Sequence, residues 1–411
     1  MKQQYILIVY LFFSAFSFSQ TENYWTRMSD FGTDTTANGL KRERAVGFSI
    51  GNYGYIGTGI DTAEIVHDDF WKFDPVTNAW TQVATLPASV RRNAVSFSTE
   101  NYGYVGTGIS TVNSSDVGSQ ILNDFWQYNP TANSWLQKAN YPGGGSGGNV
   151  YFATAFSIDS KGYVCGGKMG PNNYSNQLWE YKESIDQWTQ LPNFPDGGRY
   201  QMASFSIGFK GYVGLGADQD LYNNDFWEFN AATNQWTQIS SLPSSVRAAS
   251  ATFSIGPRGF VCMGTNGGAL DDLWEYNPYS DSWTARANFG GSSRKSAVGF
   301  SINGKGYVGT GKGNSGKKAS FYQYTPAQVV SVDELQNEIS VYPNPISDVL
   351  NITTNSTEIK ELAIFSLSGE LVMKSNFTNK IFVESINSGV YLLFAINENG
   401  DVLSQQKIIK L

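Results

Sequence analysis

The sequence is poor in the residues that build metal sites and most nucleophilic active sites. Its 411 residues include one histidine, His67, and two cysteines, Cys165 and Cys262. Zinc or copper sites that need a set of His and Cys ligands are excluded on this count. A Ser–His–Asp or Cys–His arrangement would have to use His67, which has no nearby nucleophile in the sequence. We expect His67 to be a solvated loop residue, and we predict no catalytic residue, metal or cofactor.

Charged residues are scarce as well. They make up 15% of the chain, and the formal net charge is −7. An acidic chain of this kind is a poor partner for nucleic acid, whose phosphates attract basic surfaces. We therefore predict that nucleic acid is not a partner.

Long apolar runs are limited to the N-terminus. Lys2 precedes a nearly unbroken apolar run over 5–16, and Ser17 and Ser19 then supply small residues. This pattern is typical of a secretory signal peptide, and later stretches fall short of the roughly 18 apolar residues of a spanning helix. We predict a signal peptide over 1–19, an exported mature chain and no transmembrane segment.

Aromatic residues and glycine are abundant instead, with aromatics at 15% of the chain and 43 glycines. The stretch Asp69–Trp80 alternates apolar residues up to Asp74, turns at Pro75–Asn78 and resumes at Trp80, which is the pattern of a β-hairpin. Similar hairpins recur, and their second-arm tryptophans lie 55, 53, 48 and 47 residues apart: Trp80, Trp135, Trp188, Trp236 and Trp283. A period near fifty residues predicts a propeller or a solenoid.

Two further strands precede each hairpin. The first carries a small residue, then Phe and Ser, in six copies: 47–49, 96–98, 155–157, 204–206, 252–254 and 299–301. The second begins at an aromatic residue: Tyr55, Tyr104, Tyr163, Tyr212, Phe260 and Tyr307. Small residues suit the crowded centre where propeller blades meet, and aromatics fill the widening space between blades. We therefore predict six blades of four strands, with the aromatics in the core.

The sixth repeat lacks a closing tryptophan. It ends at Phe321–Pro326, and a candidate stands at the other end of the mature chain. Trp25 precedes Trp80 by the same 55 residues that separate Trp80 from Trp135. Closing a ring with the N-terminal strand removes two exposed strand edges. We predict that Trp25 lies on the fourth strand of the blade that contains Phe300.

The two cysteines occupy the same position of two repeats that are not neighbours, Cys165 in the third and Cys262 in the fifth. Equivalent positions two blades apart in a ring are expected to exceed the ~7 Å between Cα atoms that a disulfide can bridge. An exported protein can form disulfides, but here we expect two free, buried thiols.

The repeats resemble the kelch family, whose pattern is Tyr–Val–x–Gly–Gly, a loop, then Tyr or Trp, then Trp. Tyr163–Gly167 matches this pattern literally. The other five repeats keep only its second glycine: Gly59, Gly108, Gly216, Gly264 and Gly311. The resemblance covers 21–326 and implies an all-β, six-bladed kelch-type β-propeller, which we place over 20–326. Propellers host many functions, so the resemblance does not name a chemistry.

Composition changes after residue 326. Residues 327–338 form a polar, acidic stretch that we predict to be a linker, and 339–411 alternate as the short strands of a small β-sandwich. The sandwich resembles the C-terminal sorting domain of the type IX (Por) secretion system. The resemblance rests on Tyr342–Pro345, Ser388–Tyr391 and the basic, apolar terminus Lys407–Leu411.

This second resemblance implies that the type IX machinery is a partner and that the protein reaches the cell surface or the medium. It also implies that the sorting domain is removed after export, as the signal peptide is. Because the repeats close on themselves without residues 327–411, we expect few contacts between the sandwich and the propeller.

One group of charged residues also repeats. An arginine stands five residues before the start of the Phe–Ser strand in five of the six repeats: Arg42, Arg91, Arg199, Arg247 and Arg294. Symmetry places these arginines at one rim of the propeller, near the mouth of its channel. Five guanidinium groups there would suit an anionic ligand or a glycan.

A structural role for the same arginines is the competing interpretation. An aspartate precedes the Phe–Trp or Leu–Trp pair in four of the five repeats that have the arginine: Asp69, Asp124, Asp225 and Asp272. The third repeat lacks both partners, with Val150 and Gln177, which favours Arg–Asp pairing. The sixth repeat breaks the rule, because it has Arg294 but Ser320.

The variable loops are where recognition is expected on a propeller. Two are distinctive, the long loop over 109–123 and the glycine tract over 143–148. We predict a monomeric, secreted or cell-surface binding protein with a glycan or protein ligand. The less favoured alternative is a metal-independent mutarotase or epimerase that resembles the six-bladed kelch sialic-acid mutarotase and acts through carboxylate and arginine side chains.

Overall fold

A computed structural model describes residues 23–32, 39–111, 120–144, 148–219, 221–326, 339–354, 356–366, 371–398 and 402–411. The predicted signal peptide and the predicted linker lie outside these ranges. The described residues form β-strands and one 3-10 turn, Glu183–Ile185. Within them, no helix is long and apolar enough to cross a membrane.

Six four-stranded antiparallel sheets form the blades of a propeller. Blade 1 contains β3 (Val46–Ile50), β4 (Tyr53–Gly57), β6 (Phe70–Asp74) and β7 (Ala79–Val83). Blade 2 contains β8 (Val95–Ser98), β9 (Gly103–Gly106), β10 (Phe125–Asn129) and β11 (Ser134–Lys138). Blade 3 contains β12 (Thr154–Ile158), β13 (Lys161–Cys165), β16 (Leu178–Lys182) and β17 (Gln187–Leu191).

The other three blades follow the same order. Blade 4 contains β18 (Ala203–Ile207), β19 (Lys210–Gly214), β22 (Phe226–Asn230) and β23 (Gln235–Ile239). Blade 5 contains β24 (Ala251–Ile255), β25 (Arg258–Thr265), β26 (Ala269–Asn277) and β27 (Ser282–Arg286). Blade 6 contains β28 (Val298–Ile302), β29 (Lys305–Gly309), β32 (Phe321–Thr325) and, from the other end of the chain, β1 (Tyr24–Met28).

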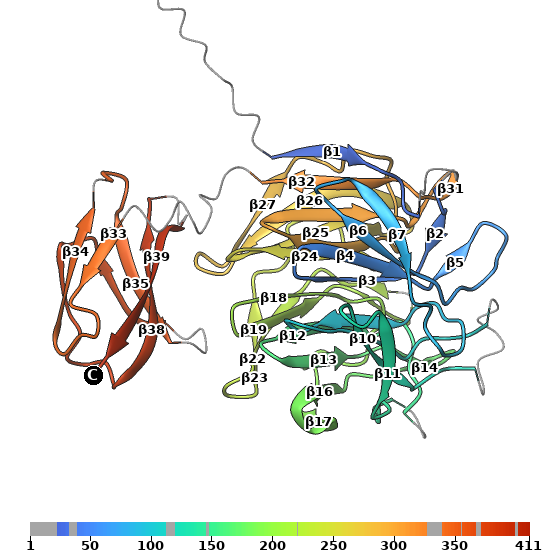
Figure 1. Cartoon of the computed structure of the whole chain (residues 1–411), viewed down its shortest axis with the longest axis horizontal. Coiled ribbons are helices and arrows are strands. Elements are labelled where there is room, and N and C mark those ends of the chain that lie inside the picture. The colour runs from blue at the N-terminus through green and yellow to red at the C-terminus, as the bar shows by residue number, and fades with distance from the viewer. Residues whose placement is uncertain are drawn as a thin grey trace, which may run out of the picture.

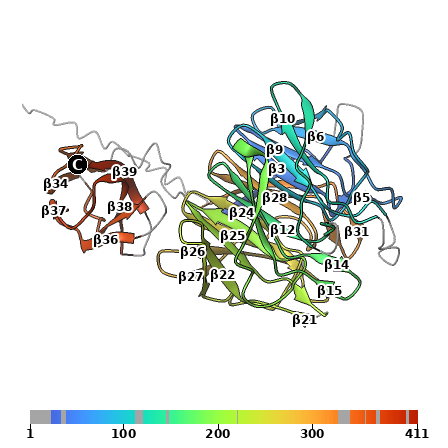
Figure 2. The same ribbon diagram turned by 90° about the horizontal axis from the view of Figure 1, so that it is seen from below.

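Figures 1 and 2 show the propeller from two directions. The first strand of each blade lies innermost, and these six strands line a central channel. The propeller has two faces. The turn face carries the short turns between first and second strands and between third and fourth strands. The loop face carries the longer loops, with four short strand pairs: β2 (Arg42–Glu43) with β5 (Ile60–Asp61), β14 (Lys168–Gly170) with β15 (Asn173–Tyr174), β20 (Ala217–Asp218) with β21 (Leu221–Tyr222), and β30 (Lys312–Gly313) with β31 (Gly316–Lys317).

The ring closes through β1. This strand pairs with β32 in antiparallel register, with Trp25 opposite Tyr324, which is the position that the Trp25 spacing predicts. The indole Nε1 of Trp25 donates a hydrogen bond of 3.0 Å to the carbonyl oxygen of Ala287, in the segment that leaves blade 5. The fourth-strand tryptophan of every other blade makes the same bond to the segment before it: Trp80, Trp135, Trp188, Trp236 and Trp283.

Aromatic side chains fill the space between blades, as predicted. The first-strand Phe stacks on the second-strand aromatic of its own blade, for example Phe156 on Tyr163 at 5.0 Å between ring centroids. The far edge of each first-strand Phe ring contacts a second-strand glycine of the next blade. In blades 1 and 2, for example, a Cβ atom at Gly103 would lie 2.1 Å from the Phe48 ring. The glycine that precedes the second-strand aromatic is therefore required by the close approach of the neighbouring blade.

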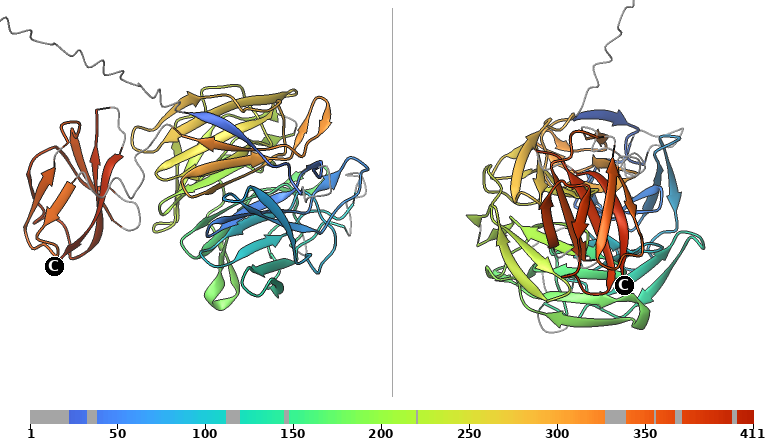
Figure 3. Two further views of the ribbon diagram at one scale, coloured as in Figure 1. Left: turned by 45° about the horizontal axis from the view of Figure 1, so that its top comes forward. Right: turned by 90° about the vertical axis from the view of Figure 1, so that its left-hand side faces the viewer.

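The C-terminal domain is a two-sheet sandwich with its own apolar core. One sheet contains β33 (Ile339–Tyr342), β34 (Val349–Thr354) and β37 (Lys380–Phe382), and the other contains β36 (Leu371–Asn376), β35 (Glu361–Ser366), β38 (Gly389–Ile396) and β39 (Val402–Lys410). The sandwich lies against the turn face of the propeller (Figures 1 and 3). We expected few contacts between the two domains, and the structure has an apolar contact at Tyr279 of blade 5, beside a cavity that residues of blades 4 and 5 also line.

Candidate functional site

The five predicted arginines lie on the loop face, one per blade, and all five are buried. Each arginine lies in the segment that leads into the first strand of its blade. Its side chain reaches the start of the loop between the second and third strands. There its guanidinium Nη1 donates to a backbone carbonyl oxygen at 2.9–3.2 Å: Thr58, Thr107, Leu215, Met263 and Thr310. The arginines thus tie two loops of the same blade together.

Four of the arginines also pair with the repeat aspartates. Arg91 holds Asp124 in a two-pronged contact, with N–O distances of 3.0 and 2.6 Å. Arg247 holds Asp272 in the same way, at 2.6 and 2.7 Å. The remaining pairs are Arg42 with Asp69 and Arg199 with Asp225. The prediction of Arg–Asp pairing is confirmed in these four blades.

A tryptophan joins each of these pairs, a contact that was not predicted from the sequence. The indole Nε1 of the third-strand tryptophan donates to the same aspartate at 2.7–2.9 Å: Trp71, Trp126, Trp227 and Trp274. A signal was available, because the aspartate stands two residues before that tryptophan in all four repeats. The aspartate therefore accepts bonds from both an arginine and an indole.

Blades 3 and 6 depart from this arrangement in different ways. In blade 3 the amide oxygen of Gln177 accepts from Trp179 Nε1 at 3.0 Å and from the backbone N–H of Gly144 at 2.8 Å. In blade 6 Arg294 donates to the Ser320 hydroxyl at 2.9 Å, and it lies over the ring of Phe289. Burial lowers the pKa of Arg294 to about 10.

These contacts bear on the predicted anion site at the rim. The five guanidinium groups are held apart, each inside its own blade and each engaged by carbonyl, carboxylate or hydroxyl oxygens. An anion could recruit them only if they left these partners, and breaking a buried ion pair costs about 3–5 kcal/mol. The geometry therefore favours the structural interpretation of the arginines over the anion site, and the channel and its mouth are the other hollow part of the loop face.

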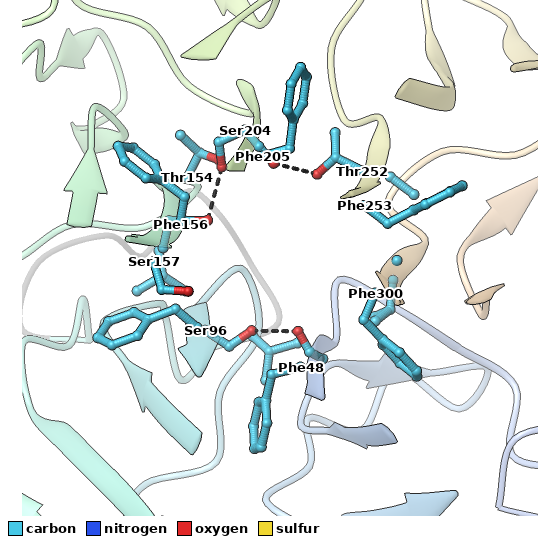
Figure 4. A pocket seen from close by; sticks show the side chains of 18 of the residues that line it. Phe48, Ser96, Thr154, Phe156, Ser157, Ser204, Phe205, Thr252, Phe253 and Phe300 are labelled. Atoms are coloured by element: carbon cyan, nitrogen blue, oxygen red, sulfur yellow. Dashed lines mark hydrogen bonds between the residues drawn. The ribbon is translucent and has the colours of Figure 1, made fainter. Parts of the chain in front are cut away.

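The central channel is lined by first strands and encloses a cavity of about 370 Å³. The Phe rings of these strands point away from the channel, and small side chains face it (Figure 4). One layer is a ring of six serines: Ser49, Ser98, Ser157, Ser206, Ser254 and Ser301. Several hydroxyls satisfy one another or the next strand, as when Ser96 Oγ donates to the Gly47 carbonyl oxygen at 3.0 Å. Among the described residues that line this cavity, none is charged.

A closed ring of backbone hydrogen bonds forms the mouth of the channel on the loop face. One residue per blade contributes, and each N–H donates to the carbonyl oxygen of its counterpart in a neighbouring blade at 2.9–3.2 Å: Arg44, Asn93, Phe152, Gln201, Ala249 and Ser296. All six residues have a positive φ, between 53° and 59°. We call them the mouth ring. They border a cavity of about 110 Å³ that leads towards the serine-lined channel.

Aromatic side chains extend outward from one side of the mouth ring. Phe152 lies 6.0 Å from Tyr200, and Tyr200 stacks on Tyr174 at 5.4 Å, measured between ring centroids. Lys168 Nζ lies 4.2 Å from the Tyr200 centroid, and the Arg44 guanidinium lies 5.5 Å from that of Phe152. We call these five residues the aromatic ledge. It combines half-buried rings with two cations at the entrance to the channel.

The ledge was not predicted, because most aromatic residues of this sequence pack in the core and the repeats favour that role for all of them. The signal lay in the comparison of repeats. At the position of Phe152 the other blades have Arg, Asn, Gln, Ala or Ser, so the fold does not require an aromatic residue there. The structure agrees with the positions predicted for the single histidine and the two cysteines. His67 is partly exposed and lies 3.0 Å from Asp61 Oδ2, and both cysteines are free and buried.

Comparisons with known proteins agree with the two parts of the fold. The KLHDC2/KLHL20/DRC7 kelch-repeats domain model matches residues 146–311, and the secretion system C-terminal sorting domain model matches 340–410. Among solved structures, the "Structure of YjhT" is similar, with a TM-score of 0.55 and 18% sequence identity over 70% of this chain and 94% of that chain. At this identity the likeness concerns the fold. No curated protein matches the sequence.

Proposed function

Taking the chain as a six-bladed kelch-repeat propeller that carries a secretion sorting domain, we propose that it is an extracellular glycan-binding protein. The sorting domain directs the chain through the type IX machinery to the cell surface or the medium. The propeller therefore meets its ligand outside the cell, where glycans are abundant. The aromatic ledge is the observation that supports this proposal.

Aromatic rings at a pocket entrance suit the apolar faces of sugar rings, and nearby polar groups then fix orientation. Tyr174 and Tyr200 are stacked on each other and held by Lys168, so little side-chain freedom is lost when a ligand arrives. Arg44 and Lys168 supply positive charge at two places on the ledge. We therefore expect acidic glycans to bind more tightly than neutral ones, and added salt to weaken that difference.

The uncharged channel supports binding over catalysis. Proton transfer to or from a sugar needs an acid or base within hydrogen-bond reach of the reacting atom. The side chains that line the larger cavity offer hydroxyls and methyl groups. A ligand held at the mouth ring would have its inward end in this neutral space.

The proposal can be tested with the mature chain on an array of neutral and acidic glycans, followed by titration calorimetry with the best ligand. Tyr200→Ala and Tyr174→Ala should each weaken binding about tenfold, the loss expected from removing one aromatic anchor. Tyr53→Ala is the matched control, because Tyr53 is an exposed tyrosine beside a lysine, Lys72, on the turn face.

Two results would contradict the proposal. One is the lack of any array ligand whose binding depends on the ledge. The other is faster anomeric exchange of N-acetylneuraminate in the presence of the protein than in the blank, followed by NMR. That second result would favour the mutarotase alternative.

A further inference from the structure

The sorting domain has apolar residues on both sides of one sheet. The inner side belongs to the core of the sandwich: Leu362, Ile364, Tyr391, Leu393 and Ala395. The residues that alternate with these along β35 and β38 form the outer side, and apart from Glu361, which pairs with Lys374, they are apolar too: Ala363, Phe365, Leu392, Phe394 and Ile396. A sheet face left to water is normally polar. The outer side of this sheet therefore needs a cover.

The propeller supplies that cover from its turn face. Tyr279, in the turn between β26 and β27, packs with Ala363, Phe365, Phe394 and Ile396. Lys374 of the sorting domain adds a cation 4.4 Å from the centre of the Tyr279 ring. Beside this contact, turns of blades 4 and 5 and the outer face of the sheet enclose a largely apolar cavity of about 170 Å³.

The repeats show that these turns are specialised for the contact. At the position of Phe209, in the first turn of blade 4, the other blades have Asn52, Asn101, Ser160, Pro257 and Gly304. At the position of Tyr279, blades 1 to 4 have Val76, Thr131, Ser184 and Ala232. The turn geometry requires neither aromatic residue. Tyr279 contacts the sorting domain, and Phe209 lines the cavity between the domains while also packing against the core between blades 3 and 4.

Three features make the contact weak. It uses a few turns and one sheet face, well short of the roughly 20–30 residues a side of a stable interface. The cavity leaves part of the apolar surface without van der Waals partners. The Tyr279 hydroxyl is buried without a hydrogen-bond partner among the described residues, which costs free energy.

We propose that the outer face of the β35–β38 sheet and the turns of blades 4 and 5 form a latch that holds only while the chain is intact. Residues 327–338 join the two domains, and a connection this short gives an effective concentration of about millimolar. A weak contact is occupied under that condition and dissociates once the connection is cut. The propeller is thus the first partner of the sorting domain, and cleavage between the domains is itself the releasing event.

The test uses the mature full-length chain with a protease site inserted in 327–338. Small-angle scattering of the uncut protein should show one docked particle. The variant Phe209→Asn with Tyr279→Ala, which copies the turns of blades 1 and 4, should lose docking and scatter as a larger, two-body particle. Val76→Ala is the matched control, since Val76 is an exposed turn residue in a blade outside the contact. After cleavage, propeller and sandwich should separate on a sizing column at about 1 µM.

Each arm can overturn the proposal. Equal radii of gyration for the uncut wild type and the double variant would show that the domains are not latched. Co-elution of the cleaved pieces at about 1 µM would show an interface that survives without the connection. Tyr279→Phe provides a check that is independent of folding, because removing the unpaired hydroxyl should delay separation after cleavage.

Discussion

The two faces of the propeller use the same six repeats differently. On the loop face, the repeated elements are buried arginines that bridge two loops, partly exposed aspartates that pair with four of them, and a mouth ring in which each blade makes the same backbone hydrogen bond. On the turn face, the repeated elements are short turns of mostly small or polar residues, and Phe209 and Tyr279 are large aromatic exceptions beside the sorting domain.

This difference separates structural from functional positions without any relative of the protein. A residue type that recurs in five or six blades meets a structural requirement common to all blades, such as closing the ring or fixing the position of a loop. A residue type that occurs in one blade, at a position where the others vary, meets no such requirement. Phe152 and Tyr279 are of the second kind, and each lies where a partner would be met.

The largest effect is expected from opening the ring. Deleting 21–30 removes β1 and with it the Trp25 bond to Ala287. Trp25 is partly buried against the core between blades 5 and 6, so its loss alone costs part of the about 3–5 kcal/mol of a fully buried tryptophan, against a total stability of about 5–15 kcal/mol for a domain. We expect the cooperative melting transition, followed by circular dichroism, to shift sharply downward. Trp25→Phe, which keeps a ring but loses the indole N–H, is the control and should cost far less. An unchanged melting curve for the deletion would refute closure by β1.

A second prediction concerns the buried ion pairs. Asp124→Gln leaves the fully buried Arg91 without its anion, so we expect a loss of about 3–5 kcal/mol in urea unfolding. Lys72→Gln, at a half-buried position of the third strand of blade 1, loses the cation contact with the Tyr53 ring and should cost no more than about 1 kcal/mol. A loss of that small size for Asp124→Gln would mean that Arg91 finds other partners.

The sequence predicts the repeated features well because six copies act as an internal alignment. The period of the tryptophans indicates the blades, the place of Trp25 indicates how the ring closes, and the joint loss at Val150 and Gln177 indicates Arg–Asp pairing. The kelch glycines follow the same logic. The second glycine has φ of 85° to 111° in all six blades, outside the range that other residues adopt comfortably. The position before it has φ near 60° and accepts Thr, Leu or Met.

The features that the sequence does not predict arise between repeats. The mouth ring consists of backbone bonds between residues about fifty apart, and backbone groups are the same in every residue. The ledge joins Phe152, Tyr174 and Tyr200 from loops whose proximity depends on the closed ring. The one sequence feature that relates to the proposed latch is in β38, whose residues are apolar at consecutive positions rather than at alternate ones. That pattern indicates a strand covered on both sides.

A third prediction uses acid to weaken one pair. Burial acts to raise the pKa of Asp272, but the hydrogen bonds and charge of Arg247 outweigh it and leave that pKa below its ordinary value. A depressed carboxyl pKa stabilises the fold above the unfolded-state value of about 3.9, and this contribution is lost as the pH falls through the folded-state pKa. Asp272→Asn lacks the contribution at every pH. Urea unfolding at pH 7 and pH 3 should therefore show the gap between wild type and variant narrowing in acid. A gap that stays constant or widens would contradict the assignment.

The smallest loss of stability is expected when two residues of blade 2 are replaced by their counterparts in blade 3. Arg91→Val with Asp124→Gln copies Val150 and Gln177, so neither partner is left alone. The new glutamine can accept from Trp126 Nε1 as Gln177 does from Trp179. A buried ion pair and an uncharged replacement of both partners differ little in free energy, because the attraction between the charges mainly offsets their loss of hydration. The cost should then come from the smaller volume of valine and from the Thr107 carbonyl oxygen, which loses the Arg91 donor; we expect about 1–2 kcal/mol, less than for Asp124→Gln alone. A double variant as unstable as the single one would mean that the pair itself holds the two loops, and blade 3 would then need another source of stability, for which the Gly144 bond to Gln177 is the first candidate.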